Sequence, residues 1–208
     1  MGGTFDPIHL GHLVAADAAR HALGLERVIF VPAGQPPHKA GRDITPAEHR
    51  FAMTLLATLD HPAFEVSRAE LDRPAPSYTI DTLRQFRAAH PDADLWFITG
   101  ADAILEILTW REPQELLAHA RFVAATRPGY PLRRLQAVQE ALGPASRERI
   151  RILEVPALAI ASRDLRERVR TGRPIRYLVP REVEAYIHKM GLYRESAAAG
   201  GAAPAVRP

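Results

Sequence analysis

The chain of 208 residues contains no cysteine. This absence excludes disulfide bonds, thiolate metal sites and catalysis by a thiol. The sequence also lacks an apolar run long enough to span a membrane, and it shows no secretory pattern. We therefore expect a cytoplasmic protein that has no membrane partner.

Blocks of like charge are missing as well. The 27 lysines and arginines are spread along the chain, and the net charge is only +3. A mild positive charge suits an anionic ligand, so we expect nucleotide phosphates as partners and no nucleic acid. The nine histidines form no cluster with carboxylates at the spacing of metal ligands, so no metal site built from side chains is predicted.

The hydrophobic pattern predicts one α/β domain over residues 1–195. Short apolar runs alternate with helical patterns, which is typical of a parallel sheet covered by helices. Strands are predicted at 28–31, 64–66, 95–99, 122–125 and 150–153, and helices after Gly11, after Thr45 and at 78–89, 101–108, 114–119, 132–142, 162–170 and 181–190. The Ala-, Gly- and Pro-rich residues 196–208 are expected to form a disordered tail.

The first twelve residues, MGGTFDPIHLGH, carry the most informative pattern. Gly2 and Gly3 allow the backbone to approach a ligand closely, because neither has a Cβ. The helical pattern that follows Gly11 places His12 in the first helical turn. The positive end of that helix favours an anion, on which His9 and His12 can converge. A glycine turn with two surface histidines is the alternative when either histidine is considered alone.

The stretch GGTFDPIHLGH closely resembles the signature of the nucleotidylyltransferases that carry an HxGH motif on a Rossmann-like fold. Its GGTFDPIH form is most similar to the bacterial nicotinate-nucleotide adenylyltransferases. The resemblance implies a doubly wound parallel sheet and transfer of the adenylyl group of ATP, which arrives with Mg²⁺, to nicotinate mononucleotide. Deamido-NAD and pyrophosphate would be the products. The sequence leaves open whether the chain forms a homo-oligomer.

This doubly wound fold normally has a strand before its phosphate loop, whereas the loop here begins at residue 2. We therefore expect the sheet of this chain to lack its first strand. Inner strands with unpaired edges are costly. We also expect the natural protein to begin upstream of Met1, with a few basic and then apolar residues that supply the strand.

The resemblance assigns His9 and His12 to the ATP phosphates. They would stabilise charge in the transition state and would not act as nucleophiles. The ATP-binding residues at the start of the chain are predicted to be Gly2, Gly3, Thr4, Phe5, His9 and His12. The catalytic residues are predicted to be His9, His12, Lys39 and Arg166.

A second cationic element is predicted at the start of the helix over 162–170. The stretch IASRDLR resembles the family's ISSTxxR motif and matches it at Ser162 and Arg166. Helix-terminal N–H groups and the Arg166 guanidinium can hold the β- and γ-phosphates of ATP. Ala161 and Arg163 replace a serine and a threonine of the motif, so an ordinary capped surface helix is the alternative for this segment alone.

Five further residues are predicted to bind nicotinate mononucleotide. Lys39 would bind its phosphate or the reacting phosphates. Trp110 is expected to stack on the flat, cationic pyridinium ring, with Thr79 helping to hold that ring. Asp102 would repel a carboxylate, so it is assigned to the ribose, to a metal-bound water or to the organisation of its loop. Arg50 matches a family position and is either a binding residue or a structural ion-pair partner.

Two other functions fit the sequence less well. A sister adenylyltransferase would use nicotinamide mononucleotide or phosphopantetheine as the acceptor, but the TGAD segment at 99–102, Trp110 and the chain length favour nicotinate. A catalytically weak nucleotide-binding module is suggested by Ala161, by Arg163 and by the expected loss of a strand. The two histidines of the motif argue against it, together with Lys39, Ser162 and Arg166.

Overall fold

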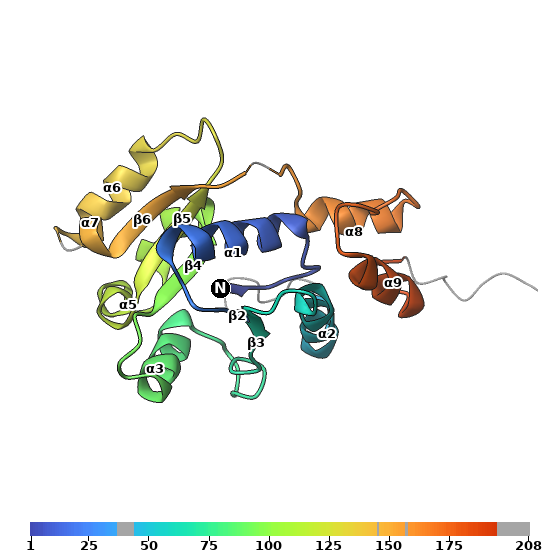
Figure 1. The fold of residues 1–208 in the computed structure, drawn as a ribbon, viewed down its shortest axis with the longest axis horizontal. Helices are drawn as coiled ribbons and strands as arrows, with labels where there is room; N and C mark the ends of the chain where they lie inside the picture. Colours follow the sequence, from blue (N-terminus) through green and yellow to red (C-terminus); the bar gives the residue numbers. More distant parts are fainter. Residues whose placement is uncertain (37–43, 145, 157, 195–208) are drawn as a thin grey trace, which may run out of the picture.

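A computed structural model describes residues 1–36, 44–144, 146–156 and 158–194 of the chain. These residues form two parallel three-stranded sheets with helices packed against them, in the orders β1-β2-β3 and β4-β5-β6 (Figure 1). The strands are β1 Gly2–Gly3, β2 Val28–Pro32, β3 Phe64–Val66, β4 Trp96–Gly100, β5 Arg121–Thr126 and β6 Ile150–Glu154. The helices are α1 Leu10–Leu23, α2 Ala47–Thr58, α3 Thr79–Ala89, α4 Ala101–Leu105, the 3-10 helix η2 Ile107–Thr109, α5 Pro113–His119, α6 Arg133–Leu142, α7 Ser146–Arg149, α8 Ser162–Arg170 and α9 Arg181–Lys189. The predicted α/β class with parallel strands is confirmed.

The predicted elements agree with the structure except at three places. The expected helix over 101–108 is divided into α4 and η2, and α7 has no counterpart among the predictions. The helix expected after Thr45 begins at Ala47. The stretch Thr45-Pro46-Ala47-Glu48 has the pattern of a capping box, but the helix has no side-chain cap. Tertiary contacts explain this difference, because the Thr45 N–H donates to Asp6 and the Thr45 carbonyl accepts from Arg50. The predicted tail at 196–208 lies outside the described residues.

The expectation that the first strand is missing is wrong in one respect. Gly2 and Gly3 form the short strand β1, which pairs in parallel with Val31 and Pro32 of β2. An added Cβ on Gly2 would lie 2.9 Å from the Phe97 ring of β4. Glycine therefore allows β1 to pack against β4 while it pairs with β2. The two residues are too few to join β2 and β4 into one ladder, so two separate sheets result.

A cavity of about 380 Å³ lies between the edges of these two sheets. Its wall consists of β2 and the start of β4, together with the C-terminal end of α1 and the α3 residues Thr82, Leu83 and Phe86. His9, His12 and Arg166 are not among its lining residues. The cavity is therefore separate from the predicted phosphate site.

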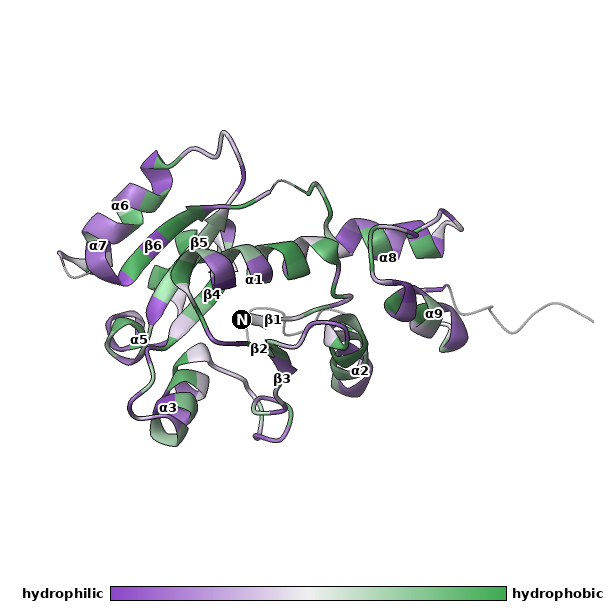
Figure 2. Cartoon of the chain, viewed as in Figure 1, coloured by the Kyte–Doolittle hydropathy of each residue, from purple (hydrophilic) through white to green (hydrophobic). Residues whose placement is uncertain are grey.

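Helix α1 lies across both sheets and connects their cores (Figure 1). Its buried side chains are the small ones of Ala15, Ala16 and Ala19, which allow the helix to approach the strands closely. The helix ends at Gly24 (φ +63°), whose N–H caps carbonyls of the last turn. Figure 2 shows hydrophobic residues along β5, β6 and the middle of α1.

The carboxyl ends of parallel strands meet at one edge of a sheet, where open α/β folds bind ligands. The loop from Thr4 to His9 follows β1 at this edge, and α4 follows β4 directly. Figure 1 shows α8 beside the N-terminal end of α1. The fold thus brings α8, from the C-terminal part of the sequence, next to the loop that follows β1. Within the described residues, no helix combines the length and the apolar character needed to cross a membrane.

Candidate active site

His9 and His12 form a stacked pair at the N-terminus of α1. Their ring centroids lie 3.7 Å apart, with 25° between the ring planes. The backbone N–H of His9 donates to Nδ1 of His12 at 3.2 Å. Since Nδ1 is the acceptor, the proton of a neutral His12 is assigned to Nε2. Nδ1 of His9 is buried without a hydrogen-bond partner within the described residues. The structure thus brings the two predicted imidazoles together at the positive end of a helix.

Gly11 makes this stacking compatible with the helix. A Cβ at Gly11 would lie 3.1 Å from ring atoms of His9. This separation is tighter than ordinary van der Waals contact, so a side chain here would displace the His9 ring. Steric exclusion by the His9 ring therefore explains why a glycine lies between the two histidines.

Phe5 supports the pair from the preceding loop. Its ring meets the His12 ring edge-on, with centroids 5.2 Å apart and an 89° angle between the planes. The backbone of Phe5 has φ +50°, a left-handed conformation that is costly for a non-glycine residue and that clusters at functional sites. Gly3 leaves room for the ring, because a Cβ there would lie 2.8 Å from it. Tertiary packing therefore fixes the loop in a strained shape.

Burial keeps both histidines neutral. It lowers the pKa of His9 to about 4. The pKa of His12 is lowered to about 3, mainly by burial and further by the neighbouring His9. Neutral imidazoles can still donate one N–H each to a phosphate oxygen.

We expect the free energy of unfolding to rise with pH between about pH 4 and pH 6.5. In this window the unfolded chain holds a proton on His9 that the folded chain has lost, so protonation stabilises the unfolded state. His9 alone should reduce the stability by about 2 kcal/mol at pH 5 relative to pH 8. Urea unfolding at a series of pH values measures the slope. A His9→Gln variant should have a smaller slope, because only the contribution of His12 would remain, and an equal slope in both proteins would contradict the shift.

Helix α8 contacts the histidine loop through the two predicted residues that match the family motif. The Ser162 hydroxyl donates to the Pro7 carbonyl at 2.9 Å, and Arg166 Nη1 donates to the Asp6 carbonyl at 2.7 Å. The Arg166 side chain keeps 36 % of its surface exposed, and this contact uses only one of its five N–H donors. Arg166 can therefore fasten the loop and bind an anion at the same time.

The two departures from the motif do not disturb these contacts. Ala161 and Arg163 are both exposed, and Ala161 precedes α8 in extended backbone. The helix therefore forms without the missing hydroxyl groups. The contacts of Ser162 and Arg166 distinguish α8 from an ordinary surface helix.

Arg50 is buried among backbone carbonyls and does not face an open binding site. Its residue is 1 % exposed, and its guanidinium donates to four backbone carbonyls at 2.6–2.9 Å. The acceptors belong to Thr4, Ala33, Gly34 and Thr45. Arg50 thus holds together the loops after β1 and β2 and the start of α2. This geometry favours a positioning role. Among the residues that the structure describes, Arg50 has no direct ion pair of the kind that the sequence left open as an alternative.

The remaining predicted residues lie in separate surroundings. Lys39 lies outside the described residues. Thr79 begins α3, and exposed Asp102 accepts the Tyr130 hydroxyl at 2.8 Å. Trp110 is half-buried and meets Phe97 edge-on, with centroids 6.2 Å apart. The Asp102 contact agrees with the loop-organising role among its predicted alternatives.

Two buried acidic residues were not predicted from the sequence. Asp6 lies inside the GGTFDPIHLGH motif, where no role was predicted for it, and it accepts the Tyr193 hydroxyl at 2.8 Å. Glu70 accepts the Thr82 hydroxyl at 2.8 Å, and burial raises its pKa. Arg73 donates to the same hydroxyl at 3.0 Å. The only sequence signal for Asp6 is its place inside the GGTFDPIHLGH motif, and Glu70 has no such signal.

A helix N-terminus with two imidazoles, at the carboxyl edge of parallel strands, is suited to phosphate groups. The fold and this site place the chain in the class of Rossmann-like nucleotide-binding proteins. The chain belongs to the cytidylyltransferase-like family, whose family model matches residues 1–168. That match runs from β1 into α8 and so includes both elements of the site.

Relatives with high sequence identity carry a narrower name. A protein of Moorella thermoacetica named probable nicotinate-nucleotide adenylyltransferase is 57 % identical over 195 residues, which cover 93 % of this chain and 90 % of the relative. A protein of the same name from Paenarthrobacter aurescens is 50 % identical over 206 residues, covering 99 % and 95 %.

Solved structures confirm the fold. The nicotinic acid mononucleotide adenylyltransferase of Plasmodium falciparum complexed with NaAD superposes with a TM-score of 0.74. The alignment covers 92 % of this chain and 94 % of that one, at 20 % identity. At this identity the likeness concerns the arrangement of the elements.

Proposed function

We propose that this chain transfers the adenylyl group of ATP to nicotinate mononucleotide and releases deamido-NAD and pyrophosphate. The names of relatives with 50–57 % identity over more than nine-tenths of the chain support the substrates. The observation that carries the chemistry is the meeting of the stacked His9 and His12 with Ser162 and Arg166 at one loop.

The reaction needs charge neutralisation and alignment more than acid-base catalysis. The attacking phosphate oxygen of the mononucleotide is already ionised near neutral pH. It attacks the α-phosphorus of ATP in line with the departing pyrophosphate. His12 donates from Nε2 to an oxygen on which negative charge develops, His9 donates beside it, and Arg166 neutralises the pyrophosphate. The buried, neutral histidines suit this task because they bring donors without requiring a counter-ion.

Mg²⁺ is proposed to arrive with ATP. Across the part of the chain that the structure describes, no three His, Asp or Glu side chains gather into a metal-binding group. This arrangement fits an ion that is held by nucleotide phosphates and water, as Mg²⁺ commonly is. The ion would reduce the charge of the leaving pyrophosphate.

The mononucleotide is proposed to bind on the side of α3 and η2. Tyr78 precedes α3 directly and shares an apolar cluster with Trp110 and Phe97. The Arg111 guanidinium lies 4.9 Å from the centroid of the Tyr78 ring. Free N–H groups at the start of α3, next to Thr79, suit the nicotinate carboxylate. Lys39 remains a proposed ligand of the reacting phosphates.

Trp110→Ala should raise the KM for nicotinate mononucleotide about tenfold and leave the KM for ATP within twofold. Stacking between an aromatic ring and a cationic ring contributes about 1–2 kcal/mol, which corresponds to this change. Steady-state kinetics with each substrate varied in turn measure both constants. Equal increases in both constants would show that Trp110 is structural.

The function is tested by the choice of acceptor. Pyrophosphate release from ATP should be measured with nicotinate mononucleotide, nicotinamide mononucleotide and phosphopantetheine in parallel. We expect the highest kcat/KM with nicotinate mononucleotide. A preference for another acceptor would assign the chain to a sister activity, and ATP binding without pyrophosphate release would support the nucleotide-binding module.

A further inference from the structure

Asp6 carries a buried carboxylate in the loop that leads to His9. The side chain is 6 % exposed. Its Oδ1 accepts the Tyr193 hydroxyl at 2.8 Å, and its Oδ2 accepts the Thr45 N–H at 3.4 Å. Tyr193 follows α9, near the end of the described chain. This contact therefore connects the turn after α9 to the loop after β1.

The Tyr193 hydroxyl is fixed as a donor. Burial raises the pKa of Tyr193, and the charge of Asp6 raises it further, so the hydroxyl keeps its proton. The hydroxyl also lies 3.9 Å from Sδ of Met53 in α2. The backbone of Tyr193 has φ +64°, a conformation that persists in a non-glycine residue only when its surroundings hold it there. A hydrogen bond to a buried carboxylate is among the stronger kinds that could hold it.

Asp6 also connects Tyr193 with the phosphate-facing arginine. Arg166 Nη1 donates to the Asp6 backbone carbonyl at 2.7 Å and lies 4.0 Å from Oδ2 of the same residue. A shift of Asp6 would therefore move Arg166. Since His9 lies three residues after Asp6 in the same loop, the shift would also reach the histidine pair.

We propose that Asp6 and Tyr193 are positioning residues that hold Arg166 at a fixed place relative to His9 and His12. Their hydrogen bond aligns the cation for the leaving pyrophosphate with the imidazoles at the α-phosphate. Neither side chain touches the substrates. The expected changes in kcat rest on the proposed function. The geometric part of the inference, that Asp6 and Tyr193 hold Arg166 in place relative to His9 and His12, does not depend on it.

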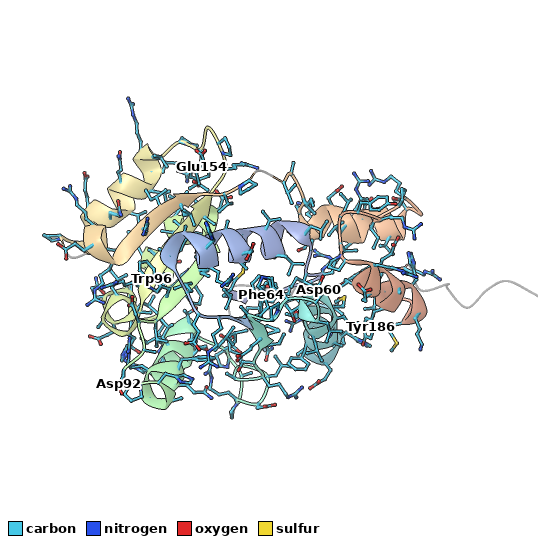
Figure 3. All side chains as sticks on the ribbon, viewed as in Figure 1. Asp60, Phe64, Asp92, Trp96, Glu154 and Tyr186 are labelled. Atoms are coloured by element: carbon cyan, nitrogen blue, oxygen red, sulfur yellow. The ribbon has the colours of Figure 1, made fainter. Side chains whose placement is uncertain are left out.

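Tyr193→Phe removes the hydroxyl that donates to Asp6 and, with it, the contacts of that hydroxyl with Thr45 and Met53. We expect kcat to fall about tenfold to a hundredfold, which is the scale of small displacements of groups that must be aligned, while the KM for nicotinate mononucleotide stays within twofold. Tyr186→Phe is the matched control. Tyr186, which is labelled in Figure 3, lies on α9. Its hydroxyl contacts Nδ1 of His49 at 2.9 Å, and this bond connects α9 to α2. A kcat of Tyr193→Phe within twofold of the control would overturn the proposal.

Two variants of Asp6 test whether the hydrogen bond is responsible. Asp6→Asn keeps a side-chain oxygen for the Tyr193 hydroxyl, whereas Asp6→Ala removes it. We expect Asp6→Asn to retain at least about fivefold more kcat than Asp6→Ala. Equal kcat values in two folded variants would overturn the proposal, because general destabilisation would then explain the loss.

The geometric part can be measured without turnover. In ¹⁵N NMR spectra of the unliganded protein, the imidazole signals of His9 and His12 should move in Tyr193→Phe and stay in place in Tyr186→Phe. If the wild-type chain forms no product from ATP and nicotinate mononucleotide, the proposed function fails while this result still supports the positioning role. Unchanged signals in Tyr193→Phe would overturn the positioning role whatever the activity.

Discussion

His12→Ala is expected to lower kcat by about a hundredfold to a thousandfold, with a much smaller change in the affinity for ATP. Removal of one preorganised donor to a developing negative charge typically costs about 2.7–4 kcal/mol of transition-state stabilisation. The Nδ1 atom of His12 accepts the backbone N–H of His9, so Nε2 is the atom that we propose to serve the reaction. In the ground state, ATP would keep the contacts proposed with Arg166 and the helix N-terminus.

Rapid-quench measurement of adenylyl transfer, together with calorimetric titration of ATP, separates the two effects. His61→Ala is a suitable control, because His61 is also stacked on an aromatic ring, with its centroid 3.7 Å from that of Phe64. It lies next to the α1 residue Asp17, outside the proposed site. A His12→Ala variant with near-normal kcat would remove His12 from the catalytic role.

The parts of the site that could be predicted from the sequence depend on short-range patterns. The stacked pair arises from residues three positions apart in one helical turn, with Gly11 between them. The match at Ser162 and Arg166 also lies within five residues. These patterns fix only local geometry. The meeting of α8 with the loop before α1 joins residues 155 and 160 positions apart, and it was expected only because both segments resemble motifs of one family.

The contacts that hold this loop in place could not be predicted in the same way. The partner of Asp6 lies 187 residues away in the chain, and no local pattern marks Tyr193. The start of α2 was misplaced for a similar reason, because the backbone of Thr45 is used by Asp6 and Arg50. Long-range hydrogen bonds of this kind compete with local capping and depend on the complete fold.

The sequence identified Arg50 as a residue of interest, but it did not predict what its side chain contacts. The family resemblance identified the residue, but nothing in the sequence shows that its donors face four carbonyls of three segments. Burial lowers its pKa, and the charges of Asp6 and Glu70 act against that shift. The acidic residues that surround the loop thus help to keep the guanidinium charged.

Arg50→Lys is expected to reduce the free energy of unfolding by about 3–5 kcal/mol. A lysine ammonium is a compact donor and cannot reach the acceptors that the planar guanidinium spans. At least two of the four carbonyls would lose their partner, and each unsatisfied buried group costs about 1–3 kcal/mol. The loss would be a large share of the roughly 5–15 kcal/mol that stabilises an ordinary domain.

Urea unfolding of Arg50→Lys should be compared with that of Arg68→Lys. The Arg68 side chain keeps 40 % of its surface exposed, and it pairs with Glu48 and Asp72 at 2.8 Å and 3.0 Å. Exposed pairs contribute about 0–1 kcal/mol, so this control should unfold close to the wild type. If Arg50→Lys also unfolded within about 1 kcal/mol of the wild type, the carbonyls would have found other donors. That result would contradict the positioning role of Arg50 and would favour substrate binding, one of the two roles that the sequence left open.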